Sequence, residues 1–168
     1  EDCGVVKKGG LNTKVLKDVS RSFYLSLRFL PKAFRSSTSV GYLLARASDT
    51  IADAGELGVE ERRELLSQFV KFVETGEGFE MPVVAGLSEG ERVLMERLDE
   101  CVEALEELPE CQQASVRKVV GIITEGQKWD LNRFEDKGVV GLQSDEELRK
   151  YTYQVAGCVG EFWTEIGF

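Results

Sequence analysis

The sequence predicts an all-α protein, a bundle of several helices. Apolar residues recur three and four positions apart along most of the chain, which is the spacing of one face of an α-helix. Glycines, prolines and two Ser-x-x-Glu capping boxes divide this pattern into segments. No segment shows the alternation of apolar and polar residues that is typical of strands. At 168 residues the chain can bury a sizeable core, and we expect residues 1–168 to form a single all-helical domain.

The first three predicted helices are bounded by proline, serine or glycine. The first ends near Pro31, because proline cannot continue a helix that precedes it. The second runs from the serine cluster 36–39, whose hydroxyls are candidate N-caps, to about Ala54. The third covers about 60–74 and ends at Gly76, since glycine readily adopts the left-handed conformation that closes a helix.

The last three predicted helices lie in the chain after about residue 88, and two of them begin at a capping box. A capping box at 88–91 opens the fourth, which ends before Pro109. The fifth covers about 111–134, and a second capping box at 144–147 opens the sixth. One apolar stripe is expected on the sixth helix, made of Leu148, Tyr151, Val155, Val159, Phe162 and Ile166.

The composition excludes several kinds of site. The sequence contains no histidine, so Ser-His-Asp catalysis, Cys-His catalysis and histidine-containing zinc sites are all ruled out. The formal net charge is −9 and no basic cluster occurs, which argues against a nucleic-acid-binding surface. No apolar run reaches the roughly 18 residues that a membrane-spanning helix needs.

The four cysteines lack the paired spacing of a metal site such as C-x₂-C. Because no secretory signal is visible, we expect reduced thiols and a cytoplasmic location. Cys101 and Cys158 fall on apolar faces of predicted helices, and we expect both to be small core residues.

The polar face of the second predicted helix carries Arg46, Asp49 and Asp53. Residues three or four apart lie on the same face of a helix, so the two aspartates can present their carboxylates to one hard cation. Carboxylates holding Mg²⁺ beside a guanidinium form a receptor for a phosphorylated ligand. Spacing alone leaves a second interpretation open, because an amphipathic surface helix with an Arg46–Asp49 ion pair has the same pattern.

Two further groups of residues are candidates for chemistry. Ser20, Arg21 and Ser22 bring together two hydroxyls and a guanidinium, which can bind phosphate oxygens near a helix start. The alternative is that Ser20 is an N-cap and Arg21 a solvated charge. Tyr151 lies on the apolar stripe of the last helix, where a tyrosine is either a catalytic group or a core residue with its hydroxyl satisfied.

Four segments of the chain form an ordered set of motifs. They are Ser20-Arg-Ser-Phe-Tyr24, Tyr42-Leu-Leu-Ala-Arg-Ala-Ser-Asp-Thr-Ile-Ala-Asp53, Gln127-Lys-Trp-Asp-Leu-Asn-Arg-Phe134 and Tyr151-Thr-Tyr-Gln-Val-Ala-Gly-Cys-Val-Gly160. Taken in this order they resemble the squalene/phytoene synthase family of head-to-head isoprenyl diphosphate synthases. The second segment looks like that family's first aspartate-rich motif, and the fourth is close to its Tyr-Cys-x-Tyr-Val-Ala-Gly-x-Val-Gly. The resemblance spans about residues 19–161.

The resemblance implies a helical bundle of the isoprenoid synthase type, of which this chain is the N-terminal part. It implies that Asp49 and Asp53 bind Mg²⁺ that bridges to a substrate diphosphate. Tyr151 would handle a proton or stabilise a cation as the cyclopropyl intermediate forms. The residues expected to hold diphosphate oxygens are Ser20, Arg21, Ser22 and Arg46.

The activity that the resemblance implies is the Mg²⁺-dependent condensation of two farnesyl diphosphates through presqualene diphosphate to squalene. Phytoene or dehydrosqualene synthesis is the alternative reaction, and a non-catalytic isoprenoid-synthase-like scaffold or a helical interaction bundle is the alternative class. Use of NADPH, and of geranylgeranyl in place of farnesyl diphosphate, stays open. Because the hydrocarbon product is nearly insoluble in water, peripheral membrane contact is an expectation.

Three departures from the family pattern bear on these expectations. No second aspartate-rich motif follows Asp53 within the 168 residues, so we expect an N-terminal half that does not complete the reaction by itself. Ala52 stands where squalene-type members commonly have an acid, and Thr152 stands where the family usually has cysteine.

Overall fold

The computed structural model describes residues 26–27, 29–134 and 137–167. Within these residues the backbone forms helices joined by turns and loops and contains no strand, so the predicted all-α class is confirmed. Most of the predicted first helix falls outside the described part, as do the candidate ligands Ser20, Arg21 and Ser22, which stay predictions.

Helix α3 comprises Lys32–Ala52 and begins earlier than predicted. Pro31 is its N-cap, with φ −52° and ψ 144°, and proline suits this place because its φ is fixed and it has no N–H to satisfy. The predicted start in the serine cluster 36–39 was therefore wrong. Ser37 lies buried inside the helix, where its hydroxyl donates a hydrogen bond to the carbonyl oxygen of Phe34 at 3.2 Å.

Helix α4, Val59–Thr75, agrees with the prediction for this segment. Its C-cap is Gly76, whose φ of 75° is the left-handed conformation that the sequence indicates. The inner face of α4 buries Leu66 and Phe69 completely.

The predicted fourth helix is in fact two helices, α5 (Glu89–Glu96) and α6 (Leu98–Glu106). The expected capping box is present, with the Ser88 side chain accepting from the backbone of Glu91 and the Glu91 side chain accepting from the backbone of Ser88. The break occurs at Arg97, where φ of −120° and ψ of 25° leave the helical region. The apolar residues keep their helical spacing across this break, so their pattern in the sequence did not predict it.

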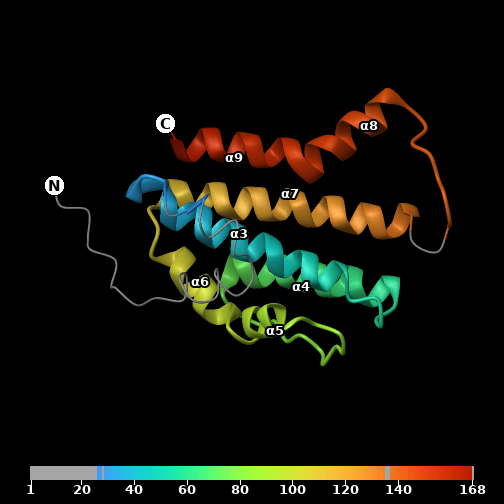
Figure 1. Cartoon of the computed structure of the whole chain (residues 1–168), viewed down its shortest axis with the longest axis horizontal. Helices are drawn as coiled ribbons and strands as arrows, with labels where there is room; N and C mark the ends of the chain where they lie inside the picture. Colours follow the sequence, from blue (N-terminus) through green and yellow to red (C-terminus); the bar gives the residue numbers. More distant parts are fainter. Residues whose placement is uncertain (1–25, 28, 135–136, 168) are drawn as a thin grey trace.

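Helix α7, Glu110–Phe134, is the long central helix of the described part and matches its predicted range closely. It packs against α3 and α4, and also against the last helical segment. Figure 1 shows α3 and α7 running in one direction and α4 running back.

The predicted sixth helix contains a π-helical insertion. It consists of α8 (Asp145–Thr152), the π-helix η1 (Tyr153–Gly157) and α9 (Cys158–Gly167). A π turn holds more residues than an α turn, so it shifts the register of every later side chain. The single apolar stripe expected here was wrong, since Leu148 and Val155 are 47% and 50% exposed.

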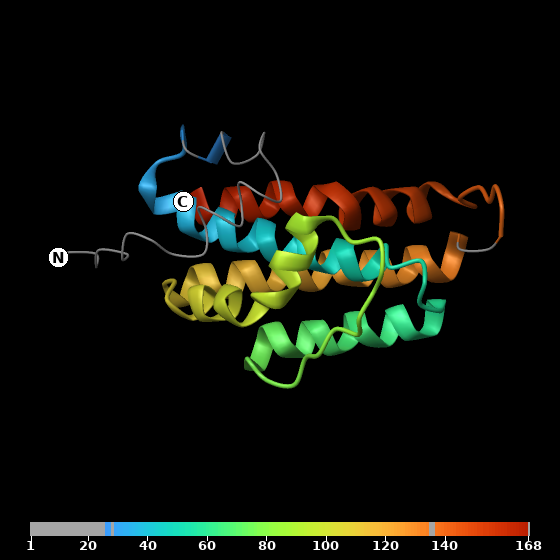
Figure 2. The ribbon, with the colours of Figure 1, turned by 60° about the horizontal axis from the view of Figure 1, so that its bottom comes forward.

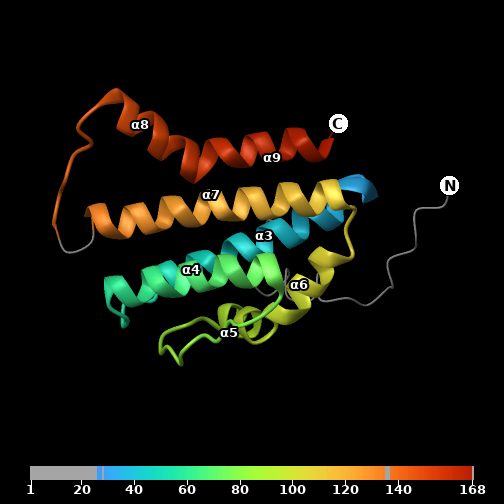
Figure 3. The same ribbon diagram turned by 180° about the vertical axis from the view of Figure 1, so that it is seen from behind.

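The helices are arranged around α7 and α3. Helices α3 and α9 lie side by side over α7 (Figure 2), and α5 and α6 lie on the side of α3 and α4 away from α8 and α9 (Figure 3). Cys101 and Cys158 are buried, as predicted. No helix in the described residues is long and apolar enough to cross a membrane. The fully enclosed core side chains include Val40, Leu43, Leu44, Ile51, Leu66, Phe69, Leu94, Leu105, Val116 and Val120.

Candidate functional site

A cleft of about 400 Å³ opens between the end of α3 on one side and the end of α8 and η1 on the other, with α7 between them. Charged and polar groups gather in it from both sides. The cleft is lined by Asp49, Ala52, Asp53, Gly55, Arg62, Gly126, Gln127, Asp130, Leu131, Tyr151 and Val155. Three residues predicted from the sequence, namely Asp49, Asp53 and Tyr151, therefore lie in one cleft.

Gly126 sets how closely η1 approaches α7. A Cβ atom at this position would lie 2.8 Å from the Cβ of Gln154, which is closer than real side chains come. Glycine in a helix interior is unfavourable by about 1 kcal/mol relative to alanine. Its presence in α7 is explained by this contact, which brings η1 and the end of α8 against the cleft.

Asp49 and Asp53 lie one turn apart on the polar side of α3. Asp49 is half-buried within the helix, and Asp53 is exposed at its C-cap. The backbone N–H of Asp53 donates to the carbonyl oxygen of Asp49 at 2.8 Å, so the helical register continues to Asp53. Both carboxylates consequently face the same cleft, while Leu44 and Ile51 on the opposite face enter the core.

Asp49 is held by two groups that favour its charged form. The side-chain amide of Gln127 donates a hydrogen bond of 2.5 Å to its Oδ1, and Arg46 Nη1 lies 3.8 Å from its Oδ2. Burial nevertheless raises the pKa of Asp49 above its ordinary value, and the nearby charge of Asp53 acts in the same direction. A carboxylate whose charge is incompletely compensated is a favourable ligand for an added cation.

Arg46 makes its closer ion pair with a different helix. Its Nη2 lies 2.7 Å from Oε1 of Glu91, the capping-box residue of α5. The hydrogen bond from the Ser88 hydroxyl lowers the pKa of Glu91, and the charge of Arg46 lowers it further. Arg46 is thus a fixed cation next to the cleft, oriented by α5.

Tyr151 stands across the cleft from the two aspartates and is half-buried. Its ring centroid lies 5.6 Å from that of Trp129 and 6.1 Å from that of Phe134. Burial raises the pKa of Tyr151, and the carboxylate of Asp130 raises it further. The phenol therefore stays protonated at neutral pH, within a group of aromatic rings.

Several residues of the cleft were not predicted as site residues. Arg62 is buried and donates a hydrogen bond of 2.9 Å to the carbonyl oxygen of Ala52, which closes the end of α3. Asp130 has the spacing of a surface pair with Arg133, yet it meets Tyr151. Gln127 contacts Asp49 although the two residues are 78 positions apart in the sequence, and residue spacing does not predict contacts over such a separation.

The oxygen ligands in the cleft suit Mg²⁺ better than a metal ion that is held entirely by protein side chains. Within the described residues no three His, Cys, Asp or Glu side chains gather closely enough to hold a metal ion. Mg²⁺ is commonly bound by one or two carboxylates together with water and substrate phosphates. Asp49 and Asp53 are two such carboxylates in the cleft.

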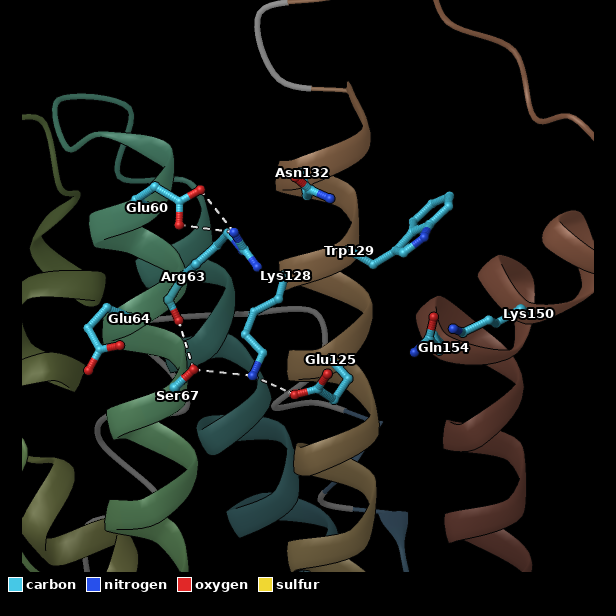
Figure 4. A pocket seen from close by; sticks show the side chains of 10 residues that line it. All are labelled: Glu60, Arg63, Glu64, Ser67, Glu125, Lys128, Trp129, Asn132, Lys150 and Gln154. Atoms are coloured by element: carbon cyan, nitrogen blue, oxygen red, sulfur yellow. Dashed lines mark hydrogen bonds and ion pairs between the residues drawn. The ribbon is translucent and has the colours of Figure 1, made fainter.

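A second hollow of about 400 Å³ lies between α4, α7 and the α8–η1 segment (Figure 4). Two of its three cations are paired with its own anions, since Lys128 pairs with Glu125 at 2.5 Å and Arg63 pairs with Glu60 at 2.9 Å. Figure 4 shows Trp129 pointing from α7 toward the α8–η1 side, away from the Arg63 pair. The cleft at Asp49 is therefore the stronger candidate for binding an ionic ligand.

Residues 16–167 match the family model described as squalene/phytoene synthase. The chain belongs to the squalene/phytoene synthase family. The resemblance found in the four sequence motifs is thereby confirmed.

Curated relatives include both kinds of synthase. The squalene synthase of Schizosaccharomyces pombe is 26% identical over 88% of this chain and 32% of that protein. The bifunctional lycopene cyclase/phytoene synthase of Blakeslea trispora is 26% identical over 90% of this chain and 24% of that protein. Human squalene synthase is 29% identical over 88% of this chain and 33% of that protein. The chain thus spans about a third or less of the length of these relatives.

Solved structures agree with this assignment. The complex of TcSQS with the ligand E5700 superposes with a TM-score of 0.78 at 26% identity, over 92% of this chain and 42% of that one. The complex of TcSQS with BPH1237 gives a TM-score of 0.76. The fold of this chain is accordingly the all-α isoprenoid synthase fold.

Proposed function

We propose that this family member acts in the Mg²⁺-dependent head-to-head condensation of two farnesyl diphosphates through presqualene diphosphate to squalene. The observation that carries the proposal is the shared cleft, in which Asp49 and Asp53 face Tyr151. Arg46, fixed by Glu91, lies beside the first of these carboxylates. Family membership supports a prenyl-transferring enzyme acting on isoprenyl diphosphates.

The carboxylate side of the cleft suits a diphosphate. Asp49 and Asp53 would hold Mg²⁺, which supplies positive charge to the leaving diphosphate when bound. Arg46 would bind diphosphate oxygens directly, because a guanidinium offers several donors in one plane. Ser20, Arg21 and Ser22 are proposed as further diphosphate ligands and lie outside the described residues.

The opposite side of the cleft suits the hydrocarbon. Ionisation of an allylic diphosphate leaves a carbocation that must be kept from water. The π face of Tyr151, which lines the cleft, attracts a cation. Closing the cyclopropane ring releases a proton from the substrate, and we propose that Tyr151 takes up this proton while its own phenolic proton passes to the Asp130 carboxylate.

Two alternatives remain within the same family. The similarity to the phytoene synthase of Blakeslea trispora favours phytoene or dehydrosqualene synthesis as the second candidate reaction. A non-catalytic scaffold that binds an isoprenoid is the alternative class. The proposal for squalene includes the use of NADPH. It also includes a cytoplasmic location and contact with a membrane surface during product release.

The reaction is tested by product analysis. The protein is incubated with Mg²⁺ and either farnesyl or geranylgeranyl diphosphate, with and without NADPH, and Asp49→Asn is the control. Squalene that forms only with NADPH and is lost in the control supports the proposal, whereas phytoene from geranylgeranyl diphosphate supports the alternative reaction. A folded protein that neither forms product nor binds these diphosphates in a Mg²⁺-dependent way contradicts both.

A further inference from the structure

Gln127 lines the cleft and contacts Asp49, the first aspartate of the motif. It lies on α7, is half-buried and lines the cleft next to Gly126. Its Nε2 lies 2.5 Å from Oδ1 of Asp49, a contact between two helices that are far apart in sequence.

The chemistry of the pair fixes the orientation of the amide. An ionised carboxylate can only accept hydrogen bonds, so the NH₂ group of Gln127 must face Asp49. The carbonyl oxygen Oε1 then points away from Asp49. It is buried, and no described residue donates a hydrogen bond to it.

This arrangement has an energetic cost that packing does not explain. A buried carbonyl oxygen without a partner costs about 1–3 kcal/mol. The contact between α3 and α7 is supplied by apolar side chains such as Leu44 and Val116, which are completely buried. A side chain of similar length without polar atoms, such as methionine, would fill the position of Gln127 without that cost.

We propose that Gln127 is a positioning residue for the cation site, an inference that rests on the proposed function. Its amide N–H donates to Asp49 and holds that carboxylate toward the cleft, where the cation would bind. Hydrogen bonds to metal ligands typically change metal affinity by about 10–100-fold.

The test compares Gln127→Met with wild type and with Gln112→Met. Gln112 lies on the same helix, is likewise half-buried and does not line the cleft, so it is a matched control. Binding of farnesyl diphosphate is followed by equilibrium dialysis while Mg²⁺ is raised, and the Mg²⁺ concentration at half-maximal binding is recorded. Thermal unfolding of each protein is measured without metal.

Gln127→Met is expected to need about 10–100-fold more Mg²⁺ and to reach the same maximal binding once that Mg²⁺ is present. Gln112→Met is expected to behave as wild type. An unchanged Mg²⁺ requirement in Gln127→Met overturns the inference and leaves the proposed function intact. Loss of thermal stability together with binding that Mg²⁺ does not restore also overturns it, because the role is then structural. Wild type that binds no farnesyl diphosphate with Mg²⁺ overturns the proposed function and the inference together.

Discussion

Arg46 lies 2.7 Å from Glu91 but 3.8 Å from Asp49, so its closer ionic partner belongs to α5 and not to the aspartate motif. Glu91 also completes the capping box that begins α5. One carboxylate thus fixes both the start of a helix and the position of the arginine beside the cleft. The placement of Arg46 depends on residues that lie 45 positions further along the chain.

Replacement of Glu91 by glutamine separates these two roles. Glutamine at this position preserves the capping box but removes the charge that faces Arg46. We expect Glu91→Gln to lower the free energy of unfolding by about 0.5–1 kcal/mol, the usual contribution of a partly exposed ion pair. Urea unfolding at neutral pH measures this loss, with Glu103→Gln, an exposed residue on α6, as the charge-matched control.

The same variant has a defined pH dependence. The pKa of Glu91 is lowered in the folded protein, so its contribution is fully present above the ordinary glutamate pKa of about 4.3 and is lost as the pH falls through the lower folded-state pKa. The difference in unfolding free energy between wild type and Glu91→Gln should therefore shrink on acidification below about pH 4. A difference that grows on acidification would contradict the stabilising contribution assigned to the Glu91–Arg46 ion pair.

Alanine substitutions at two glycines of α7 should have opposite effects. At Gly126 the added methyl meets Gln154 at 2.8 Å, and overpacking of about 1–3 kcal/mol exceeds the gain in helix propensity. At Gly121 nothing lies within 4 Å of the added methyl, so alanine should stabilise the helix by about 0.5–1 kcal/mol. Urea unfolding of both variants tests the packing of η1 on α7, and a Gly126→Ala variant as stable as Gly121→Ala would contradict it.

The cysteines should differ in reactivity. Burial raises the pKa of Cys101 to about 12, so about one thiol in ten thousand is ionised at pH 8. Cys111 is exposed on α7. Brief treatment of the native protein with iodoacetamide at pH 8, followed by peptide mass spectrometry, should modify Cys111 and spare Cys101. In urea both should react, and equal labelling of the two in native buffer would contradict the described core.

Local sequence signals predicted much of the fold for physical reasons that can be named. The end of α4 at Gly76 and the start of α5 at the Ser88 capping box depend on neighbouring residues alone, and both were correct. The start of α3 was misplaced because the serine cluster 36–39 offers N-cap hydroxyls, whereas the helix begins after Pro31 and buries Ser37 inside it.

Features that depend on distant residues were not predictable in this way. The π turn at η1 leaves the residue pattern intact while it changes which side chains are exposed, as Val155 shows. The spacing of Asp49 and Asp53 indicated a shared face, and the structure places both in one cleft. Gln127, the partner of Asp49, and Glu91, the partner of Arg46, became visible only when the helices were packed.

The most direct test of the cleft as a Mg²⁺–diphosphate site is the binding of farnesyl diphosphate measured with Mg²⁺ and with excess chelator. Wild type, Asp49→Asn and Asp53→Asn are compared with Asp99→Asn, which makes the same change in charge at an exposed residue outside the cleft. We predict Mg²⁺-dependent binding by wild type and Asp99→Asn, weakened about tenfold or more in the two cleft variants. Binding that is unaffected by chelator, or equal in all four proteins, would contradict the site.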